Sequence, residues 1–209
     1  MVLQQNADVK LWGWADPHTA VKVDASWGAR ATAKSGGDGR WEVMLKTPAG
    51  GYEPQRITIT GDGKVELNDV LIGEVWFAAG QSNMEMGVLG FHNCPVARSN
   101  EVIARADARR GKVRYVKIPK TASYTPEERV AGCWNEFSTE TAPLCTAVGY
   151  FFAEMLSRAL DVPVGVIDSS WGGSRIECWT PREALEKYPD IDLSEKAIAD
   201  QPDYMRPMA

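Results

Sequence analysis

The feature that most constrains the fold is a change in hydrophobic patterning near Leu71. Before it, short apolar runs alternate with polar residues and are separated by turns such as "SGGDG" and "PAGGYEP". Strands at this spacing are typical of a small β-sandwich. The next run, "VLIGEVWFAA", is almost continuously apolar, which predicts a strand buried on both faces of a parallel sheet. We therefore predict a β-sandwich-like region over 1–72 and an α/β region over 73–209.

The second region alternates between helical and extended patterns. "EVIARADARRG" indicates a helix, "KVRYVKIP" a strand, "PLCTAVGYFFAEMLSRALD" a helix and "PVGVID" a short strand. The second of these helices carries apolar residues at helical spacing: Val148, Phe151, Phe152, Met155 and Leu156. This order is typical of a layered α/β structure with right-handed crossovers. The tail over 190–209 is polar and contains proline, so it needs no core position.

The first region contains four tryptophans: Trp12, Trp14, Trp27 and Trp41. Surface tryptophans can stack on sugar rings, but large aromatic side chains in a small β-domain are more often buried. We predict that all four contribute to the core.

Composition excludes several classes of protein. The net charge of -5, without a basic cluster, argues against a nucleic-acid partner. No stretch approaches the roughly 20 apolar residues of a membrane span. With no C-x-x-C pair and only His18 and His92 available, no metal site is expected. The four cysteines are interpreted as buried free thiols or one incidental disulfide: Cys94, Cys133, Cys145 and Cys178.

Ser82 lies where the apolar run gives way to "GQSNMEM". In open α/β sheets ligands bind beyond the carboxyl ends of the strands. Gly80 permits a tight turn there, and free N–H groups at the start of a following helix favour an oxyanion. Two interpretations follow: Ser82 is the nucleophile of an acyl transfer, or it only caps the segment "NMEM".

A second segment, "VIDSSWGGSRIECWTP", also leaves a strand and enters a loop. An N–H group of Gly172 or Gly173 could point into the same crevice as an oxyanion donor, although glycine pairs also mark ordinary turns. Ser169, Ser170 and Ser174 are rival nucleophiles, but none follows the pattern of strand, glycine, serine and helix as closely as Ser82.

Together, "GEVWFAAGQSNMEM", "SSWGGSRIECWTP" and a small β-region beginning "MVLQ" resemble the sialate O-acetylesterase family of SGNH-type hydrolases over nearly the whole chain. The family removes acetyl groups from sugars, including sialic acids. The resemblance implies an SGNH-like parallel sheet layered with helices, Ser82 as nucleophile, and an oxyanion hole formed by its N–H and that of Gly172 or Gly173. It implies no cofactor and a location outside the cytoplasm.

Residues flanking the two motifs are candidates for the sugar pocket: Gln81, Asn83, Glu85, Arg175, Glu177 and Trp179. Some have structural alternatives. Glu85 could satisfy the start of a helix, and Arg175 could pair with Glu177 rather than with a sialic carboxylate.

The chain departs from the family pattern in lacking a later Q-G-E-S-N-like segment and the D-x-x-H pair that supplies acid and base. His92, near Ser82 in sequence, is an alternative base. We expect the chain to be the N-terminal portion of a larger enzyme, with an incomplete α/β domain. A C-terminal fragment or second chain would supply the histidine and aspartate and cover exposed apolar surface. The alternative function is a non-catalytic carbohydrate-binding or scaffold module.

Overall fold

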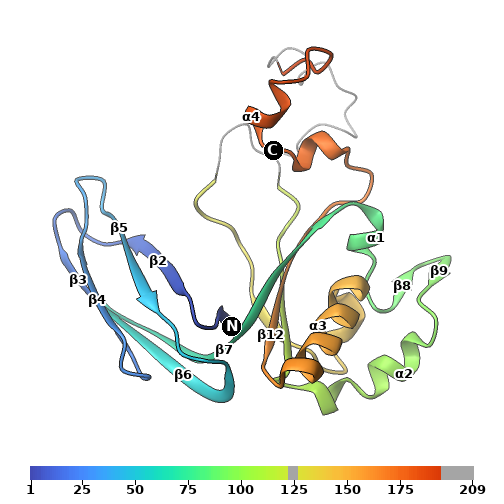
Figure 1. Ribbon diagram of the computed structural model, residues 1–209, viewed down its shortest axis with the longest axis horizontal. Helices are drawn as coiled ribbons and strands as arrows, with labels where there is room; N and C mark the ends of the chain where they lie inside the picture. Colours follow the sequence, from blue (N-terminus) through green and yellow to red (C-terminus); the bar gives the residue numbers. More distant parts are fainter. Residues whose placement is uncertain (122–126, 194–209) are drawn as a thin grey trace.

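A computed structural model describes residues 1–121 and 127–193, so most of the predicted polar tail lies outside the described residues. A β-rich half and an α/β half share one long strand, β7 (Lys64–Gly80) (Figure 1). The first part of β7 pairs antiparallel with β6 (Gly51–Thr60), and its last seven residues, 74–80, pair parallel with β12 (Val164–Ser170). The two halves have separate hydrophobic cores. The predicted boundary at residue 72 therefore falls inside one continuous strand.

The strands of the β-rich half are β1 (Val2–Gln4), β2 (Asp8–Trp14), β3 (Ala20–Ala25), β4 (Arg30–Lys34), β5 (Arg40–Lys46) and β6 (Gly51–Thr60). Strands β2 and β5 form a two-stranded sheet, and the others lie in an eight-stranded sheet with the order β11-β10-β12-β7-β6-β3-β4, in which β1 also pairs with β7. Alternate residues of β3 and β5 meet in the core, as their period-two patterns predict.

The prediction that all four tryptophans are buried is wrong for two of them. Trp41 is 6% exposed and Trp27 packs against the core, but Trp12 and Trp14 are 48% and 40% exposed. The reason is the register of β2, in which the smaller Gly13 faces inward. A Cβ atom on Gly13 would lie 2.9 Å from the Trp41 ring, so the glycine provides the space that this ring occupies.

The α/β half begins with α1 (Ser82–Glu85), β8 (Gly90–Phe91), β9 (Cys94–Pro95), α2 (Ser99–Ala104), η1 (Ala106–Arg109), β10 (Val113–Lys117), β11 (Trp134–Glu136) and η2 (Ala142–Leu144). It continues with α3 (Ala147–Leu160), β12 (Val164–Ser170), η3 (Ile176–Trp179) and α4 (Arg182–Leu185). The strands predicted over 112–119 and 163–168 and the long second helix are therefore confirmed as β10, β12 and α3. The helix predicted over 101–111 is wrong in extent, because α2 ends at Ala104 and only the short η1 follows. The purely parallel sheet is not confirmed, because β11 runs antiparallel to β10 and the sheet is mixed, with few helices.

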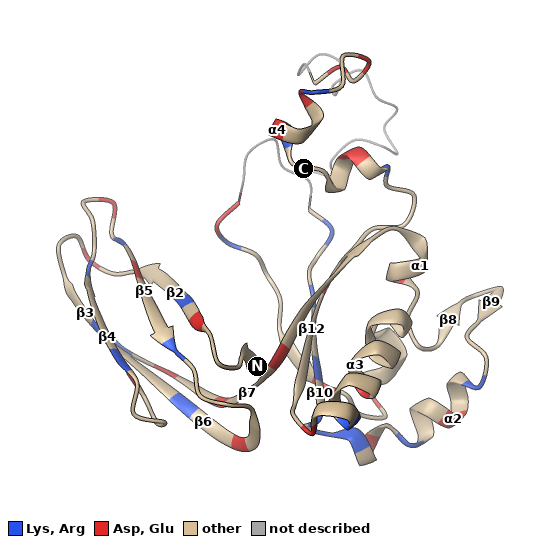
Figure 2. Cartoon of the chain, viewed as in Figure 1, with Lys and Arg blue, Asp and Glu red and all other residues tan. Residues whose placement is uncertain are grey.

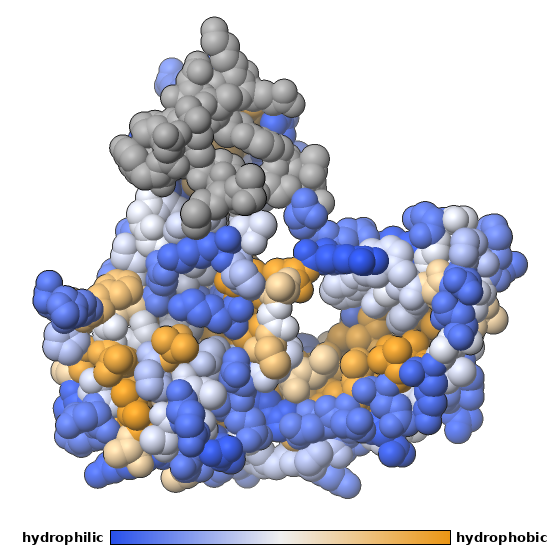
Figure 3. Space-filling model, turned by 180° about the vertical axis from the view of Figure 1, so that it is seen from behind, coloured by the Kyte–Doolittle hydropathy of each residue, from blue (hydrophilic) through white to orange (hydrophobic). Residues whose placement is uncertain are grey.

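Strand β7 is less buried than its apolar sequence predicts. Trp76 and Phe77 are 46% and 64% exposed. Helix α3 covers one face of the strand, where Phe152 packs edge-on against Trp76 with ring centroids 4.9 Å apart. Phe77, the next residue, points to the opposite face. Seen from behind, apolar surface extends across the centre of the molecule and into the hollow beside the β-rich half (Figure 3).

Helix α3 approaches the sheet closely through its small residues, and most of its large apolar residues are exposed. Ala147, Gly149, Ala153 and Ser157 are buried together with Tyr150. A Cβ atom on Gly149 would lie 3.0 Å from Val166 of β12, which shows how closely the helix approaches the strand. The exposed large apolar residues of α3 are Val148, Phe151, Phe152, Met155 and Leu160. We call the first four of them the outer stripe of α3.

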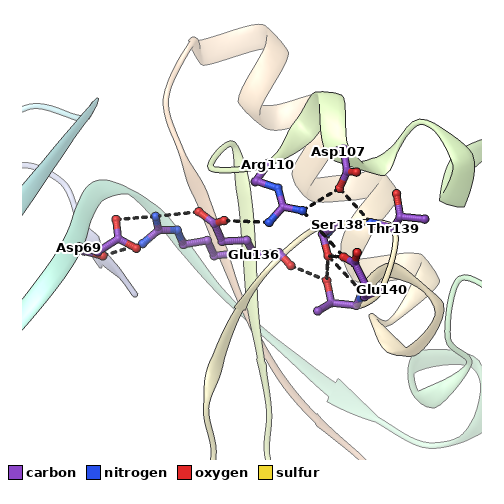
Figure 4. Close-up of polar contacts among 9 residues, drawn as sticks. Asp69, Asp107, Arg110, Glu136, Ser138, Thr139 and Glu140 are labelled. Carbon is purple, nitrogen blue, oxygen red and sulfur yellow. Dashed lines mark hydrogen bonds and ion pairs between the residues drawn. The ribbon is translucent and has the colours of Figure 1, made fainter.

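A buried arginine connects the two halves through a polar network, of which Figure 4 labels Asp69, Glu136, Arg110 and Asp107. The Arg114 side chain, on β10, is 4% exposed. Its guanidinium donates to the main-chain oxygen of Asp69 at 2.6 Å, to the Asp69 carboxylate at 2.8 Å and to Glu136 of β11 at 3.2 Å. From Glu136 the network continues through an ion pair to Arg110, which binds Asp107 at 3.0 Å.

Acidic and basic residues are mixed along both halves of the chain (Figure 2). No helix among residues 1–121 and 127–193 is long and apolar enough to cross a membrane. The four cysteines are free thiols, and only Cys145 is buried, so the prediction of buried thiols is wrong for Cys94, Cys133 and Cys178. Burial raises the pKa of the Cys145 thiol.

Candidate active site

Ser82 is the first residue of α1, directly beyond the carboxyl end of β7. Gly80 makes the turn possible because its φ of +148° is a conformation that L side chains rarely adopt. The helix cap is Gln81, whose Oε1 accepts from the Ser82 N–H at 3.0 Å and from the Ser82 hydroxyl at 2.8 Å. The interpretation of Ser82 as a helix cap is therefore wrong, and its role as nucleophile stays a prediction.

The glycine-rich loop after β12 lies beside Ser82. Gly80 and Ser170, at the ends of β7 and β12, are paired in the parallel ladder, and the Trp171 N–H donates to the Gly80 oxygen at 2.8 Å. A Cβ atom on Gly172 would lie 3.4 Å from Ser82 Oγ. The structure thus brings together the two motifs that the sequence places 90 residues apart (172 minus 82).

The N–H groups predicted for the oxyanion hole already have acceptors. The Ser82 N–H donates to Gln81, and the Gly172 N–H makes a short hydrogen bond to Oε2 of Glu85. Gly173 follows with φ of +83°, and its N–H has no acceptor among the described residues. Of the proposed donors, only the Gly173 N–H has no acceptor in the described part of the chain.

Glu85 is held from two sides. Its Oε2 accepts from Gly172, and its Oε1 lies 2.5 Å from the Lys120 ammonium. The Lys120 nitrogen also lies 5.8 Å from the centre of the Trp171 ring. Burial acts to raise the pKa of Glu85, but the Lys120 ammonium and the Gly172 N–H outweigh it and hold that pKa below the usual glutamate value.

A second buried carboxylate, Asp168, lies on β12 and is fully buried. Ser170 donates to its Oδ1 at 2.5 Å, while the Lys117 ammonium lies 3.8 Å from Oδ2. Oδ2 has no hydrogen-bond partner among the described residues. Burial raises the pKa of Asp168. Asp168 and Lys120 are not among the residues predicted from the sequence. A lone acidic residue in an apolar strand is a usable signal for Asp168, whereas Lys120 has no local signal.

Two of the three rival serines, Ser170 and Ser174, have structural partners, while Ser169 remains an untested alternative. Ser170 is buried and bound to Asp168, which removes it as a rival nucleophile. The Ser174 hydroxyl donates to the Trp171 oxygen at 2.6 Å and accepts from Trp179 Nε1 at 2.8 Å. Trp179 therefore braces the loop through its indole N–H.

The other candidates are more scattered. Asn83 and Arg175 are exposed and Glu177 is half-buried, and no ion pair joins Arg175 to Glu177 in the described part of the chain. That structural alternative is therefore wrong. His18 lies in the turn between β2 and β3, and His92 lies between β8 and β9. Neither histidine hydrogen-bonds to Ser82, whose hydroxyl donates to Gln81.

Within residues 1–121 and 127–193, no group of three histidine, cysteine, aspartate or glutamate side chains is arranged to hold an ion.

Comparison with known proteins confirms the resemblance inferred from the two motifs. The chain is 29% identical to rat and 30% identical to human sialate O-acetylesterase, in each case over 89% of its length. It spans 36% and 38% of these relatives, a little over a third of each. A crystal structure of a carbohydrate acetylesterase from Xanthomonas citri superposes with a TM-score of 0.81 at 37% identity, covering 88% of this chain and 41% of that one. No family model matches the chain.

Proposed function

We propose, from the likeness to sialate O-acetylesterases, that this chain carries the nucleophile and oxyanion loop of an enzyme that removes acetyl groups from carbohydrates. The observation that supports the proposal most is the position of Ser82. Its hydroxyl lies beside Gly172 at the carboxyl ends of two adjacent parallel strands, where α/β enzymes bind their ligands. The proposed substrates are O-acetylated sugars, sialic acids or related glycans, acted on outside the cytoplasm.

The proposed reaction is an acyl transfer through an acetyl-enzyme. Ser82 Oγ attacks the acetyl carbonyl carbon while a base takes its proton, and the negative charge develops on the carbonyl oxygen. Collapse of this intermediate breaks the ester bond, and the sugar oxygen leaves with the proton. Water then hydrolyses the acetyl-serine by the same route. The Gly173 N–H is one available oxyanion donor, and such a donor contributes roughly a hundredfold or more in rate.

We further propose that the base and its acid come from a companion polypeptide, either a C-terminal segment or a second chain. The hydroxyl of Ser82 donates to an amide oxygen, which cannot take its proton, and neither histidine of the chain is bound to it. The outer stripe of α3 and Phe77 offer apolar surface for such a companion. Arg175, which is exposed, is the proposed contact for an anionic sugar.

The second candidate function is a non-catalytic carbohydrate-binding or scaffold module. It is favoured by the occupied N–H groups of Ser82 and Gly172 and by the missing imidazole. The two functions differ in whether Ser82 becomes acylated.

The decisive experiment uses the native preparation together with any companion found by intact mass. We expect a fluorophosphonate to label Ser82 stoichiometrically in the assembled protein, with release of acetate from O-acetylated sialic acid. The chain alone should be nearly inactive on p-nitrophenyl acetate. Ser82→Ala in the assembly is the matched variant: full deacetylation by it would refute the proposed nucleophile. Sugar binding without labelling would establish the non-catalytic module instead.

A further inference from the structure

Three segments that follow neighbouring strands meet at one carboxylate beside Ser82. Glu85 ends α1, which follows β7; Lys120 follows β10; and Gly172 follows β12. These three strands are adjacent in the sheet, in the order β10-β12-β7. A single side chain therefore connects the ends of all three strands.

We propose that Glu85 and Lys120 form a clamp that fixes the Gly172 loop against Ser82, so that both are positioning residues for the esterase reaction. The positioning role rests on the proposed esterase function, whereas the existence of the clamp does not. The clamp replaces the hypotheses that Glu85 binds the sugar or satisfies the start of a helix, since Glu85 is the last residue of α1 and faces the loop.

Each oxygen of the Glu85 carboxylate has its own partner. Oε1 binds the Lys120 ammonium at 2.5 Å and Oε2 accepts from the Gly172 N–H, while the side chain is only 16% exposed. A hydrogen bond from a main-chain N–H to a carboxylate is stronger than one to a neutral acceptor. The partial burial also reduces screening by solvent. Lys120 supplies the opposite charge that makes this carboxylate stable in its charged form.

The loop is shaped to fit the carboxylate. A Cβ atom on residue 172 would lie 2.7 Å from Glu85 Oε2, too close for two non-bonded atoms, and 3.4 Å from Ser82 Oγ. A side chain at position 172 would therefore displace the Glu85 carboxylate from this hydrogen bond. Because the Gly172 N–H is committed to Glu85, the clamp acts through the loop and leaves the Gly173 N–H without an acceptor in the described structure.

The clamp can be tested without any activity, by NMR of the full chain labelled with ¹⁵N. We expect the Gly172 amide proton to resonate far downfield and to titrate below the usual glutamate range. Glu85→Gln should move it upfield and abolish the titration, whereas Lys120→Met should keep the hydrogen bond and shift the titration to higher pH. Glu101→Gln is the matched control, because Glu101 forms an exposed ion pair with Arg98. An unchanged chemical shift and titration of the Gly172 amide proton in Glu85→Gln would overturn the clamp.

The positioning role is tested on the assembled protein by the rate of fluorophosphonate labelling of Ser82. We expect labelling to be about tenfold slower in Glu85→Gln, less than the loss of an oxyanion donor itself, because Glu85 acts only through the loop. The positioning role is refuted if Glu85→Gln moves the Gly172 amide resonance upfield and yet leaves the labelling rate unchanged. Failure of the unmodified protein to label would overturn the proposed function, while the amide titration would still decide whether the clamp exists.

Discussion

Replacement of Arg114 by methionine tests whether the buried arginine stabilises the connection between the two halves. The side chain is 4% exposed and donates three hydrogen bonds of 2.6–3.2 Å to Asp69 and Glu136. Removing one partner of a buried ionic group costs about 3–5 kcal/mol. The carboxylates left behind are 57% and 36% exposed and regain water, so we expect the lower end of this range, about 3 kcal/mol. For a chain of this length that lowers the melting temperature by about 6–12 °C.

The assay is urea unfolding followed by the fluorescence of the chain's eight tryptophans. Arg110→Met is the matched control in the same network, because Arg110 is 51% exposed and its ion pairs span 3.0–3.8 Å. We expect the control to cost less than about 1 kcal/mol. Arg114→Lys should fall between the two, since an ammonium cannot reproduce the guanidinium fork. The reasoning fails if Arg114→Met unfolds within about 0.5 kcal/mol of the unmodified chain.

Three further predictions follow from packing and burial. Gly13→Ala should cost about 1–3 kcal/mol in unfolding free energy and perturb near-ultraviolet circular dichroism, because the new Cβ lies 2.9 Å from the Trp41 ring; an unchanged spectrum and stability would contradict this. Met155→Ser should change the stability of the chain alone by less than about 0.5 kcal/mol, because Met155 is 68% exposed, yet weaken binding of the proposed companion about tenfold or more in a titration. Burial raises the pKa of Asp168 in the folded state above its value in the unfolded state. The protonated Asp168 side chain therefore contributes stability at pH values below the unfolded-state pKa, and this contribution is lost as the pH rises through the folded-state pKa. As the pH falls from the folded-state pKa to the unfolded-state pKa, the free energy of unfolding of the unmodified chain should therefore rise relative to that of Asp168→Asn. A difference between the two that does not change with pH would contradict a raised pKa of Asp168.

Local sequence patterns predicted the helices and strands of this fold better than they predicted which side chains are buried. Strands β10 and β12 and helix α3 were predicted because their periodicity is a property of adjacent residues. Burial depends on which neighbours are present, and no pattern in one segment encodes them. Trp12 and Trp76 show this: both lie in predicted strands, yet each side chain is about half exposed. Trp12 faces outward because Gly13 takes the inward position, and Trp76 is only partly covered because a single helix packs over it.

The same distinction separates the predicted from the missed residues of the site. Ser82 and Gly172 lie in motifs that follow strands, so the sheet topology brings them together. Lys120 lies 35 residues beyond Glu85 (120 minus 85), after a different strand, and no spacing rule connects them. Gln81 was predicted to lie in the sugar pocket. In the structure its side-chain amide oxygen caps α1 and accepts a hydrogen bond from the Ser82 hydroxyl.

The energies of the Ser82–Gln81 and Gly172–Glu85 hydrogen bonds indicate which of the two would break during catalysis. The hydrogen bond from the Ser82 hydroxyl to Gln81 joins neutral groups, and such a bond contributes only about 0.5–1.5 kcal/mol. An imidazole can replace Gln81 as acceptor at little cost, since Gln81 is exposed and can rotate into water. The bond from Gly172 to Glu85 involves a charged acceptor, and such bonds contribute about 1.5–3 kcal/mol. We therefore expect Gln81 to release both the hydroxyl and the N–H of Ser82 when a base arrives, and Glu85 to keep the Gly172 N–H. The donors then available to an oxyanion are the N–H groups of Ser82 and Gly173.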